Sequence, residues 1–196
     1  MDMKRISSLL NGCVVVSNDI LRDSRGYFVK AFQEGDFVER TFELEQVDEV
    51  FWTESSQGVA RGLHLQVPPK AICKYVMCTS GRVLDLVLDL RSDSETFGQL
   101  ETVELGPADG LSQGIFVPKG FAHGFITLSE TATVVYLQNG RFSPMHDTGV
   151  LLESVRHMIP INTELLKDLL SDRDRNLPHF DEFPKYSSSE WQLQNE

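Results

Sequence analysis

The segment Val83–Leu90, VLDLVLDL, constrains the fold most strongly, because its residues alternate with the two-residue period of a β-strand. One face carries only leucine and forms a core. The other face carries valine and two carboxylates, Asp85 and Asp89. Such carboxylates indicate either a ligand-filled lumen or buried pairs with basic groups, and the two interpretations are compatible. A solvent-exposed face is the alternative, which the valines on that face disfavour.

Short β-strand patterns recur along most of the chain, each bounded by Gly, Pro, Asp or Ser, which is typical of a sandwich or barrel. The clearest pair is expected to form a hairpin, in which 71–79 pairs with 83–90 around Ser80-Gly81. After residue 139 the pattern changes, and leucine spacing behind Asn162 and Thr163 predicts a helix over 162–176. The other strands are expected at 13–17, 27–32, 47–53, 61–66, 102–105, 114–117, 124–128 and 133–138.

Length and charge limit the class of protein. The 196 residues, 41% of them hydrophobic, fit one domain spanning 1–196. A net charge of −11 disfavours nucleic acid and anionic membranes as partners, so a bound phosphate needs a local basic cluster. Cys13, Cys73 and Cys78 match no zinc spacing and are expected to be reduced core residues. With no signal-like or membrane-spanning apolar stretch, we expect a soluble, cytoplasmic protein.

The stretch SQGVARGLHLQVPPKAICKYVMCTSG, residues 56–81, carries polar groups inside expected strands. A lone strand histidine is usually structural, but His64 has Arg61 and Lys74 nearby in sequence, and His123 follows in PKGFAHGF. A regular strand would send Arg61 and His64 to opposite faces. Both can reach one ligand only if the chain bends, and Gly62 is the residue that permits a bend.

Several kinds of chemistry fit these residues poorly. A metal site of the double-stranded β-helix class needs a second histidine two positions after His64, where Gln66 stands, so we expect no metal. No cysteine adjoins a histidine and no nucleophile-elbow motif is present. An imidazole, an ammonium group, a phenol and inward carboxylates instead suit proton transfer at carbon. A base removes a proton α to a carbonyl, a cation stabilises the enolate, and an acid returns the proton.

Six motifs in order, from about residue 25 to residue 178, resemble the dTDP-4-dehydrorhamnose 3,5-epimerase family: GVARGLHLQVPP, AICKYV, GRVLDLVLDLRSDSETFGQLETVEL, IFVPKGFAHGFITLSE, VVYLQ and LSDRDRNLP. The resemblance implies an all-β, cupin-type double-stranded β-helix, or jelly-roll barrel, with a short helical C-terminal segment. It also implies a homodimeric isomerase that uses no cofactor. Its substrate would be a deoxysugar linked to a nucleotide diphosphate, either dTDP or CDP. C3, C5 or both are inverted beside a C4 ketone.

The resemblance also assigns roles to residues. It makes His64 the general base, paired with Asp174, Lys74 the enolate-stabilising cation, and Tyr136 the acid on the opposite face of the sugar. Asp85 and His123 are expected to support the site from behind. The residues that it implies in substrate binding are Arg25, Lys30, Glu49, Arg61, Gln66, Phe142 and Arg173, with Arg61 holding the diphosphate.

Departures from the family pattern lie in its specificity residues. Lys30 replaces a glutamate, and Glu49 and Phe51 replace a glutamine and an asparagine. Thymine N3 is a donor that suits a carboxylate, whereas cytosine N3 is an acceptor that suits an ammonium group, so Lys30 favours cytosine. The alternative is that Lys30 points to solvent and thymine is held otherwise. Phe142 replaces a second tyrosine, which indicates a single inversion, although Tyr136 preserves opposite-face protonation.

Three functions therefore remain open. The first is an epimerase of the dTDP-4-dehydrorhamnose 3,5-epimerase type. The second is a CDP-linked C5-epimerase acting on a 3,6-dideoxy-4-hexulose with a changed base pocket. The third is a sugar-nucleotide-binding cupin without catalysis, which the presence of all four catalytic residues disfavours.

Overall fold

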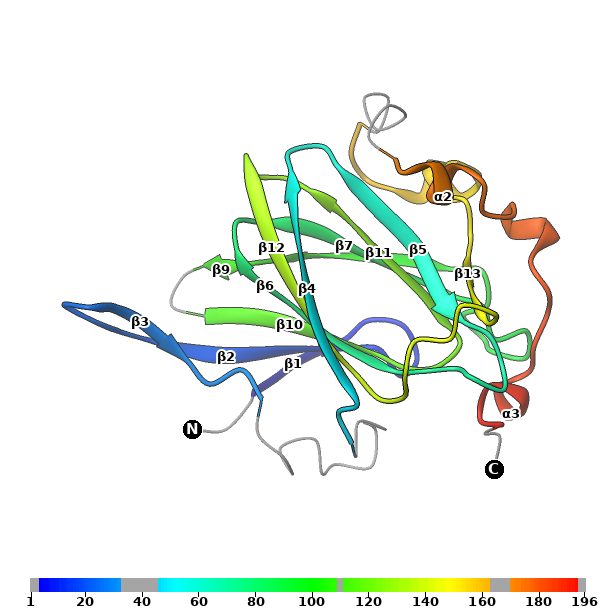
Figure 1. Ribbon diagram of the computed structural model, residues 1–196, viewed down its shortest axis with the longest axis horizontal. Helices are drawn as coiled ribbons and strands as arrows, with labels where there is room; N and C mark the ends of the chain where they lie inside the picture. Colours follow the sequence, from blue (N-terminus) through cyan, green and yellow to red (C-terminus); the bar gives the residue numbers. More distant parts are fainter. Residues whose placement is uncertain (1–3, 33–45, 109–110, 163–169, 194–196) are drawn as a thin grey trace.

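The computed structural model describes residues 4–32, 46–108, 111–162 and 170–193. Two antiparallel sheets curl around a common interior, and short helices follow at the C-terminal end (Figure 1). This jelly-roll, cupin-like architecture confirms the expected all-β fold. Within the described ranges, no helix has the length and apolar character needed to cross a membrane.

The larger sheet has the order β1-β2-β10-β6-β12-β4, with β3 pairing β2 and β9 pairing β10. The smaller sheet has the order β13-β5-β11-β7-β8. The strands of the larger sheet are β1 (Lys4–Ser8), β2 (Val14–Asp23), β3 (Gly26–Val29), β4 (Glu49–Ser56), β6 (Lys74–Ser80), β9 (Pro107–Ala108), β10 (Leu111–Val117) and β12 (Thr131–Gln138). Those of the smaller sheet are β5 (Ala60–Gln66), β7 (Val83–Asp89), β8 (Leu100–Leu105), β11 (Phe121–Thr127) and β13 (Asp147–Gly149).

The described part of the C-terminal segment contains single turns of helix. Of the helix expected over 162–176, the described part is α2, which starts after its N-cap Ser171, and 163–169 lie outside the described residues. The helical elements are α1 (Leu152–Val155), η1 (Arg156–Met158), α2 (Asp172–Arg175), η3 (Phe180–Glu182) and α3 (Ser188–Trp191).

The expected hairpin between 71–79 and 83–90 is wrong. β6 lies between β10 and β12 in the larger sheet, whereas β7 lies between β11 and β8 in the smaller one. The turn at Gly81, with φ +74°, is therefore a corner between the sheets. A Cβ at Gly81 would lie 2.1 Å from the Thr131 carbonyl oxygen, so the corner has no room for a side chain. Alternation identifies the faces of a strand but not its neighbours, which explains the error.

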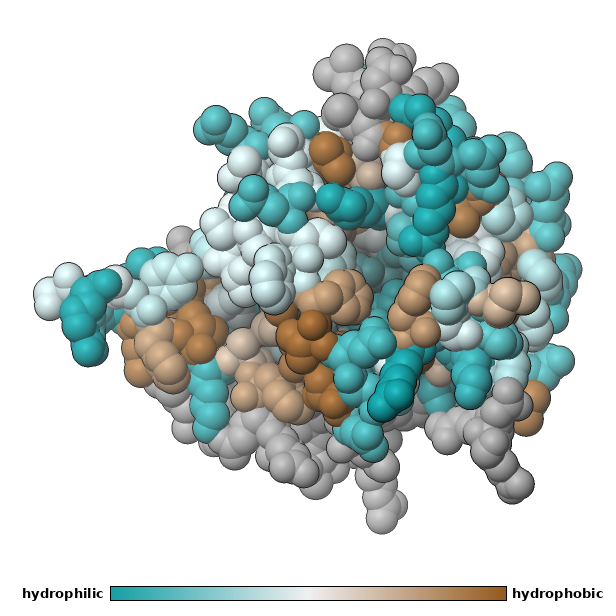
Figure 2. Space-filling model, in the orientation of Figure 1, coloured by the Kyte–Doolittle hydropathy of each residue, from teal (hydrophilic) through white to brown (hydrophobic). Residues whose placement is uncertain are grey.

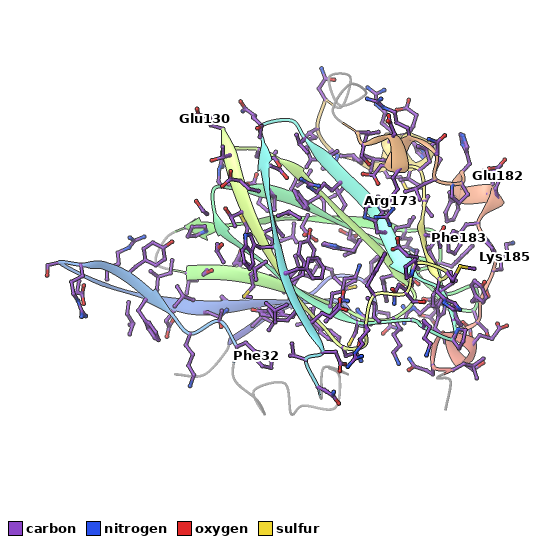
Figure 3. All side chains as sticks on the ribbon, viewed as in Figure 1. Phe32, Glu130, Arg173, Glu182, Phe183 and Lys185 are labelled. Atoms are coloured by element: carbon purple, nitrogen blue, oxygen red, sulfur yellow. The ribbon has the colours of Figure 1, made fainter. Side chains whose placement is uncertain are left out.

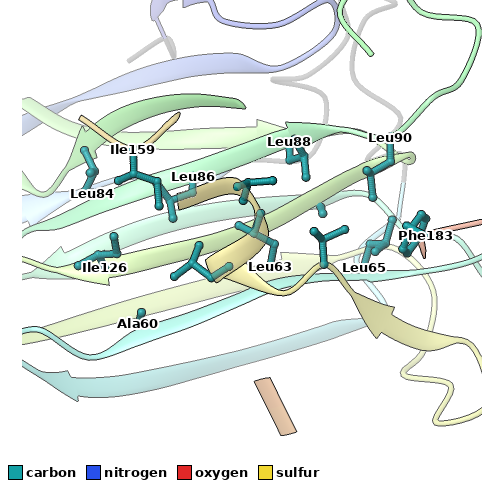
Figure 4. Packing of buried hydrophobic residues seen from close by; sticks show 14 of the residues in the cluster. Ala60, Leu63, Leu65, Leu84, Leu86, Leu88, Leu90, Ile126, Ile159 and Phe183 are labelled. Carbon is teal, nitrogen blue, oxygen red and sulfur yellow. The ribbon is translucent and has the colours of Figure 1, made fainter. Parts of the chain in front are cut away.

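Both faces of β7 are buried. Its leucines lie in a row and form a core with residues of β5, β11 and the C-terminal segment, such as Ile159 and Phe183 (Figure 4). Val83 and Val87 instead join a second core that both sheets contribute to. Asp85 and Asp89 are 1% and 0% exposed and pair with His123 and Arg91, so the carboxylates face the interior as buried pairs and the solvent-face alternative is wrong.

β5 bends at Gly62 as the sequence predicts. The pairing of β5 with β11 shifts register there, because Arg61 lies opposite Phe125 and His64 lies opposite His123. Gly62 has φ +101°, and a Cβ at this position would lie 2.6 Å from the backbone oxygen of His123. The bulge turns both Arg61 and His64 into one cavity.

We expect Gly62→Ala to lower the free energy of unfolding by about 2 kcal/mol or more, because the left-handed conformation and the backbone contact both oppose a side chain. Chemical denaturation of the purified variant measures the loss. The matched control is Gly26→Ala, since Gly26 also has a positive φ of +131° but open space around its Cβ position. Equal losses in the two variants would contradict the importance of the close contact.

Candidate active site

Residues of both sheets and of α2 line a cavity of about 290 Å³. β4, β6 and β12 of the larger sheet form one wall, and β5 and β11 of the smaller sheet form the other. The lining residues are Phe51, Thr53, Arg61, His64, Gln66, Ile72, Lys74, His123, Gly124, Tyr136, Gln138, Phe142, Asp147, Ser171, Arg173 and Asp174.

His64 is held by Asp174. Its Nε2 lies 2.5 Å from Asp174 Oδ1, and the side chains of His64 and Asp174 are 23% and 4% exposed. Asp174 reaches this position from the first turn of α2, where its backbone N–H donates to the hydroxyl of Ser171. Burial raises the pKa of Asp174, but the hydrogen bond and charge of His64 outweigh it and lower that pKa overall. An ionised Asp174 accepts a hydrogen bond from the Nε2–H of His64. The other ring nitrogen, Nδ1, therefore keeps the lone pair that a base needs.

Lys74 lies at the start of β6 and has no hydrogen bond or ion pair to any described residue, although Asp147 and Arg173 lie near it. Burial lowers the pKa of Lys74 to about 8, with Asp147 opposing and Arg173 reinforcing the shift. Arg173 extends from α2 over β5 (Figure 3) and pairs with Asp147 at 2.5 Å. The ammonium group is therefore available to a ligand.

Tyr136 lies on β12, in the sheet opposite His64. The ring of Phe51 stacks on the ring of Tyr136 with centroids 4.7 Å apart, and His123 meets its edge at 6.0 Å. Behind it, His123 Nε2 lies 2.9 Å from Asp85 Oδ2, and both side chains are almost fully buried. Burial and the charge of Asp85 raise the pKa of Tyr136, so its phenol stays protonated at neutral pH.

Arg61 lies on β5, immediately before the bulge at Gly62. Its Nε donates to the hydroxyl of Ser55 at 2.9 Å, and its terminal nitrogen donates to the backbone oxygen of Glu54. These contacts with β4 fix the guanidinium at the cavity wall without neutralising it, because neither acceptor is a carboxylate. The cationic group remains available to a bound anion.

The structure brings most of the predicted site residues together. Nine of them line the cavity: Arg61, His64, Gln66, Lys74, His123, Tyr136, Phe142, Arg173 and Asp174. Asp85 lies behind His123, as expected of a supporting group. Arg25, Lys30 and Glu49 do not line the cavity. Arg25 is exposed at the β2–β3 turn and pairs with Asp23.

Glu49 and Gln66 use their side chains to hold the loop that follows β12. Glu49 accepts hydrogen bonds from the Gln138 amide at 2.8 Å and from the Phe142 backbone N–H at 3.0 Å. The Gln66 amide donates to Lys70 and Arg141 carbonyls and accepts from the Ser143 backbone N–H. Both residues therefore position the wall of the cavity.

Sequence reasoning missed six cavity residues: Thr53, Ile72, Gly124, Gln138, Asp147 and Ser171. Ser171 had a usable signal, because a serine three positions before an acidic residue is the pattern of a helix N-cap. The others carry no local signal, since a strand or loop residue becomes part of a site only through its distant neighbours. Within the described part of the chain, no three His, Cys, Asp or Glu side chains converge as metal ligands do.

The cavity has an imidazole on one sheet, and a phenol and an ammonium group on the other, which are groups that suit proton transfer at carbon. The model of the dTDP-4-dehydrorhamnose 3,5-epimerase family matches residues 7–182. The chain belongs to this family, and the resemblance in its motifs is confirmed.

Individual relatives agree. The dTDP-4-dehydrorhamnose 3,5-epimerase of Methanothermobacter thermautotrophicus is 33% identical over 186 residues, covering 94% of this chain and 98% of the relative. The crystal structure of the Elizabethkingia anophelis enzyme of the same name is 35% identical, with TM-score 0.81, covering 92% of this chain and 98% of that one. A variant of a 3'-monoepimerase from Streptomyces bikiniensis, solved with dTDP, is 27% identical with TM-score 0.84, covering 96% and 95%.

If Lys74 must be an ammonium group, kcat/KM will fall as pH rises through about 8, because the free enzyme loses that proton there. Lys74→Arg keeps a charge at every accessible pH, so we expect this variant to be slower but to lose the fall near pH 8. Rates measured from pH 6 to pH 10 with both proteins check this. A fall at the same pH in Lys74→Arg would assign it to another group.

Proposed function

We propose that this protein epimerises a 4-keto-6-deoxyhexose linked to a nucleotide diphosphate, through an enolate. The observation that carries the proposal is the placement of a carboxylate-bound imidazole and a protonated phenol on opposite sheets of one cavity. Inversion needs a proton to leave one face of a carbon and another to arrive at the other face. A cavity with both groups on the same wall would return the original configuration.

His64 Nδ1 removes the proton from a carbon α to the C4 ketone, and the C–H electron pair forms the enolate. The ammonium group of Lys74 stabilises the enolate oxygen, whose charge develops as the proton leaves. Tyr136 then donates its phenolic proton to the opposite face of the carbon. The imidazolium returns its proton to solvent and the phenolate takes one up, which restores the enzyme.

This geometry favours catalysis over a binding module. A protein that only holds a sugar nucleotide has no need of a carboxylate-bound imidazole facing a protonated phenol, nor of the unpaired ammonium group of Lys74, whose burial costs folding free energy. Arg61 offers a cation for the diphosphate within the same cavity. The reaction uses groups of the chain alone and needs no cofactor.

The nucleotide is proposed to be dTDP or CDP. The names of the relatives favour dTDP. Lys30 favours CDP, because an ammonium group donates to cytosine N3 and has nothing to accept from thymine N3. The Lys30 side chain is exposed at the end of the β2–β3 hairpin and outside the cavity lining, so it meets a base only if that hairpin reaches another copy.

Solvent exchange tests the reaction and the nucleotide together. Incubation in D2O with 4-keto-6-deoxyhexoses linked to dTDP, CDP, GDP or UDP should add deuterium, read by mass spectrometry, with one deuteron for a single inversion and two for both. His64→Ala should lose the exchange by about 1000-fold or more, because the other possible bases of the described lining, His123 and Asp147, are paired with Asp85 and Arg173. The absence of uptake with every nucleotide would refute the reaction, and uptake retained in His64→Ala would refute its base.

We also propose a homodimer whose copies exchange the β2–β3 hairpin across the interface. The hairpin projects away from the barrel (Figure 1), and apolar side chains gather over it and over the start of β4 (Figure 2). Leu21, Tyr27 and Phe28 on this hairpin are 48%, 53% and 58% exposed. Burying them against a second copy removes apolar surface from water, and carries Arg25 and Lys30 toward the partner's cavity.

Mixing inactive variants tests this exchange. Arg25→Ala and His64→Ala should each be nearly inactive alone, since one lacks a substrate contact and the other the base. After mild unfolding and refolding together, half of the dimers are mixed, and each has one intact site, so about a quarter of the wild-type activity should return. If Arg25 serves the site of its own chain, or no site, the mixture will gain no activity over the separate variants.

A cytoplasmic location is proposed as well. All three cysteines are buried and unbridged, as predicted. Burial raises the pKa of the Cys13 and Cys78 thiols, which keeps them protonated and unreactive. Thiols kept in this state fit a reducing compartment.

A further inference from the structure

A second hollow, of about 770 Å³, lies beside the reaction cavity. It is formed by loops at one end of the barrel: 67–73, the Pro118-Lys119-Gly120 turn, and the loop after β12. Ile72 and Phe142 belong to both cavities and separate them. The remaining lining residues are Gln46, Asp48, Pro69, Lys70, Ala71, Lys119, Asn139, Gly140, Arg141, Ser143 and Gln192.

Lys119 is the unusual residue of this hollow. The residue as a whole is only 5% exposed, yet its side chain has no hydrogen bond or ion pair to any described residue. A lysine is rarely so deeply buried unless its ammonium group is paired, because an unpaired charge loses hydration as its surroundings close around it. A buried, unpaired cation that lines a hollow is a group prepared for an anion from outside the chain.

Two further cations surround the same space. Lys70 and Arg141 line the hollow with exposed side chains, from the loops on either side of Lys119. Asp48 is the only acidic residue of the described lining, and its carboxylate already accepts from the Gly140 backbone N–H and the Gln46 amide. Three positive charges against one carboxylate is the reverse of the chain as a whole, whose net charge is −11.

We propose that this hollow binds the phosphate or diphosphate group of a small molecule, at a site separate from the reaction cavity. Lys119 and Lys70 supply point charges, and Arg141 supplies a planar pair of donors that matches phosphoryl oxygens. Arg61, the cation proposed for the substrate diphosphate, does not line the hollow. The two anion sites are therefore distinct and lie on opposite sides of the Ile72–Phe142 partition.

Occupancy of the hollow acts on the reaction cavity through that partition. Phe142 precedes Ser143 and follows Arg141, so an anion held by Arg141 restrains the segment that carries the aromatic wall. A bound phosphorylated molecule thus changes the apparent KM for the sugar nucleotide.

Calorimetric titration with inorganic diphosphate tests the site. The titration uses the full-length Arg61→Gln protein, in which the proposed substrate-diphosphate cation is absent, so the readout does not depend on epimerase activity. We expect one diphosphate to bind per chain. Adding Lys119→Met, which keeps the length of the side chain but removes its charge, should weaken binding by about tenfold or more, and adding Arg141→Gln, at an exposed position, should weaken it as well.

The matched control is Lys185→Met in the same background, because Lys185 lies over Phe97 and outside the hollow. It removes the same charge and should leave the affinity unchanged. Thermal unfolding of each variant verifies that it is folded. No binding to the Arg61→Gln protein, or equal affinity with and without Lys119 and Arg141, would overturn the proposal.

Discussion

A close backbone approach between β5 and β11 organises this barrel. Gly62 on β5 and Gly124 on β11 face each other, and a Cβ on either would lie 2.6 Å or 2.4 Å from a backbone oxygen of the other strand. Because neither strand carries a side chain there, the bulge in β5 fits against β11, and Arg61 and His64 enter the same cavity. The reaction chemistry therefore depends on two residues that have no functional group.

The two imidazole–carboxylate pairs of the cavity differ in environment, and this difference separates their roles. Asp174 has a lowered pKa, and its partner His64 keeps partial exposure, so the imidazole can both bind substrate and exchange protons with water. Asp85 has a raised pKa because of burial, and its partner His123 is sealed from solvent. That second pair lies behind Tyr136 and sets its surroundings, whereas the first is suited to take the proton itself.

The sequence predicted most of the strands because these depend on local patterns, and the family motifs picked out residues that the fold brings together in one cavity. The two-residue alternation of side chains located β7 and its inward carboxylates. The three-residue spacing between Arg61 and His64, with Gly62 between them, predicted the bulge. The predictions that failed concern strand pairing and side-chain contacts between residues that are distant in the chain. The corner at Gly81 was mistaken for a hairpin because pairing is not encoded in one strand. The same limit hid Asp147, whose importance lies in its pairing with Arg173 from α2.

Glu49 acts on a different part of the site from the one that its place in the family pattern indicated. As a departure from the family pattern it indicated an altered base contact, but its two oxygens hold Gln138 and the Phe142 backbone. Asp48 holds Gly140, and Gln66 holds Ser143 from the other sheet. The loop is thus fixed by both sheets at once.

Phe142 separates the two cavities. Its backbone is held by Glu49, which lies outside the lining of the reaction cavity. The aromatic ring of Phe142 is therefore a surface that the hollow and the reaction cavity share. Glu49 and Phe142 therefore act as one unit: the carboxylate fixes the backbone, and the ring lines the cavity without a hydroxyl that could donate a proton.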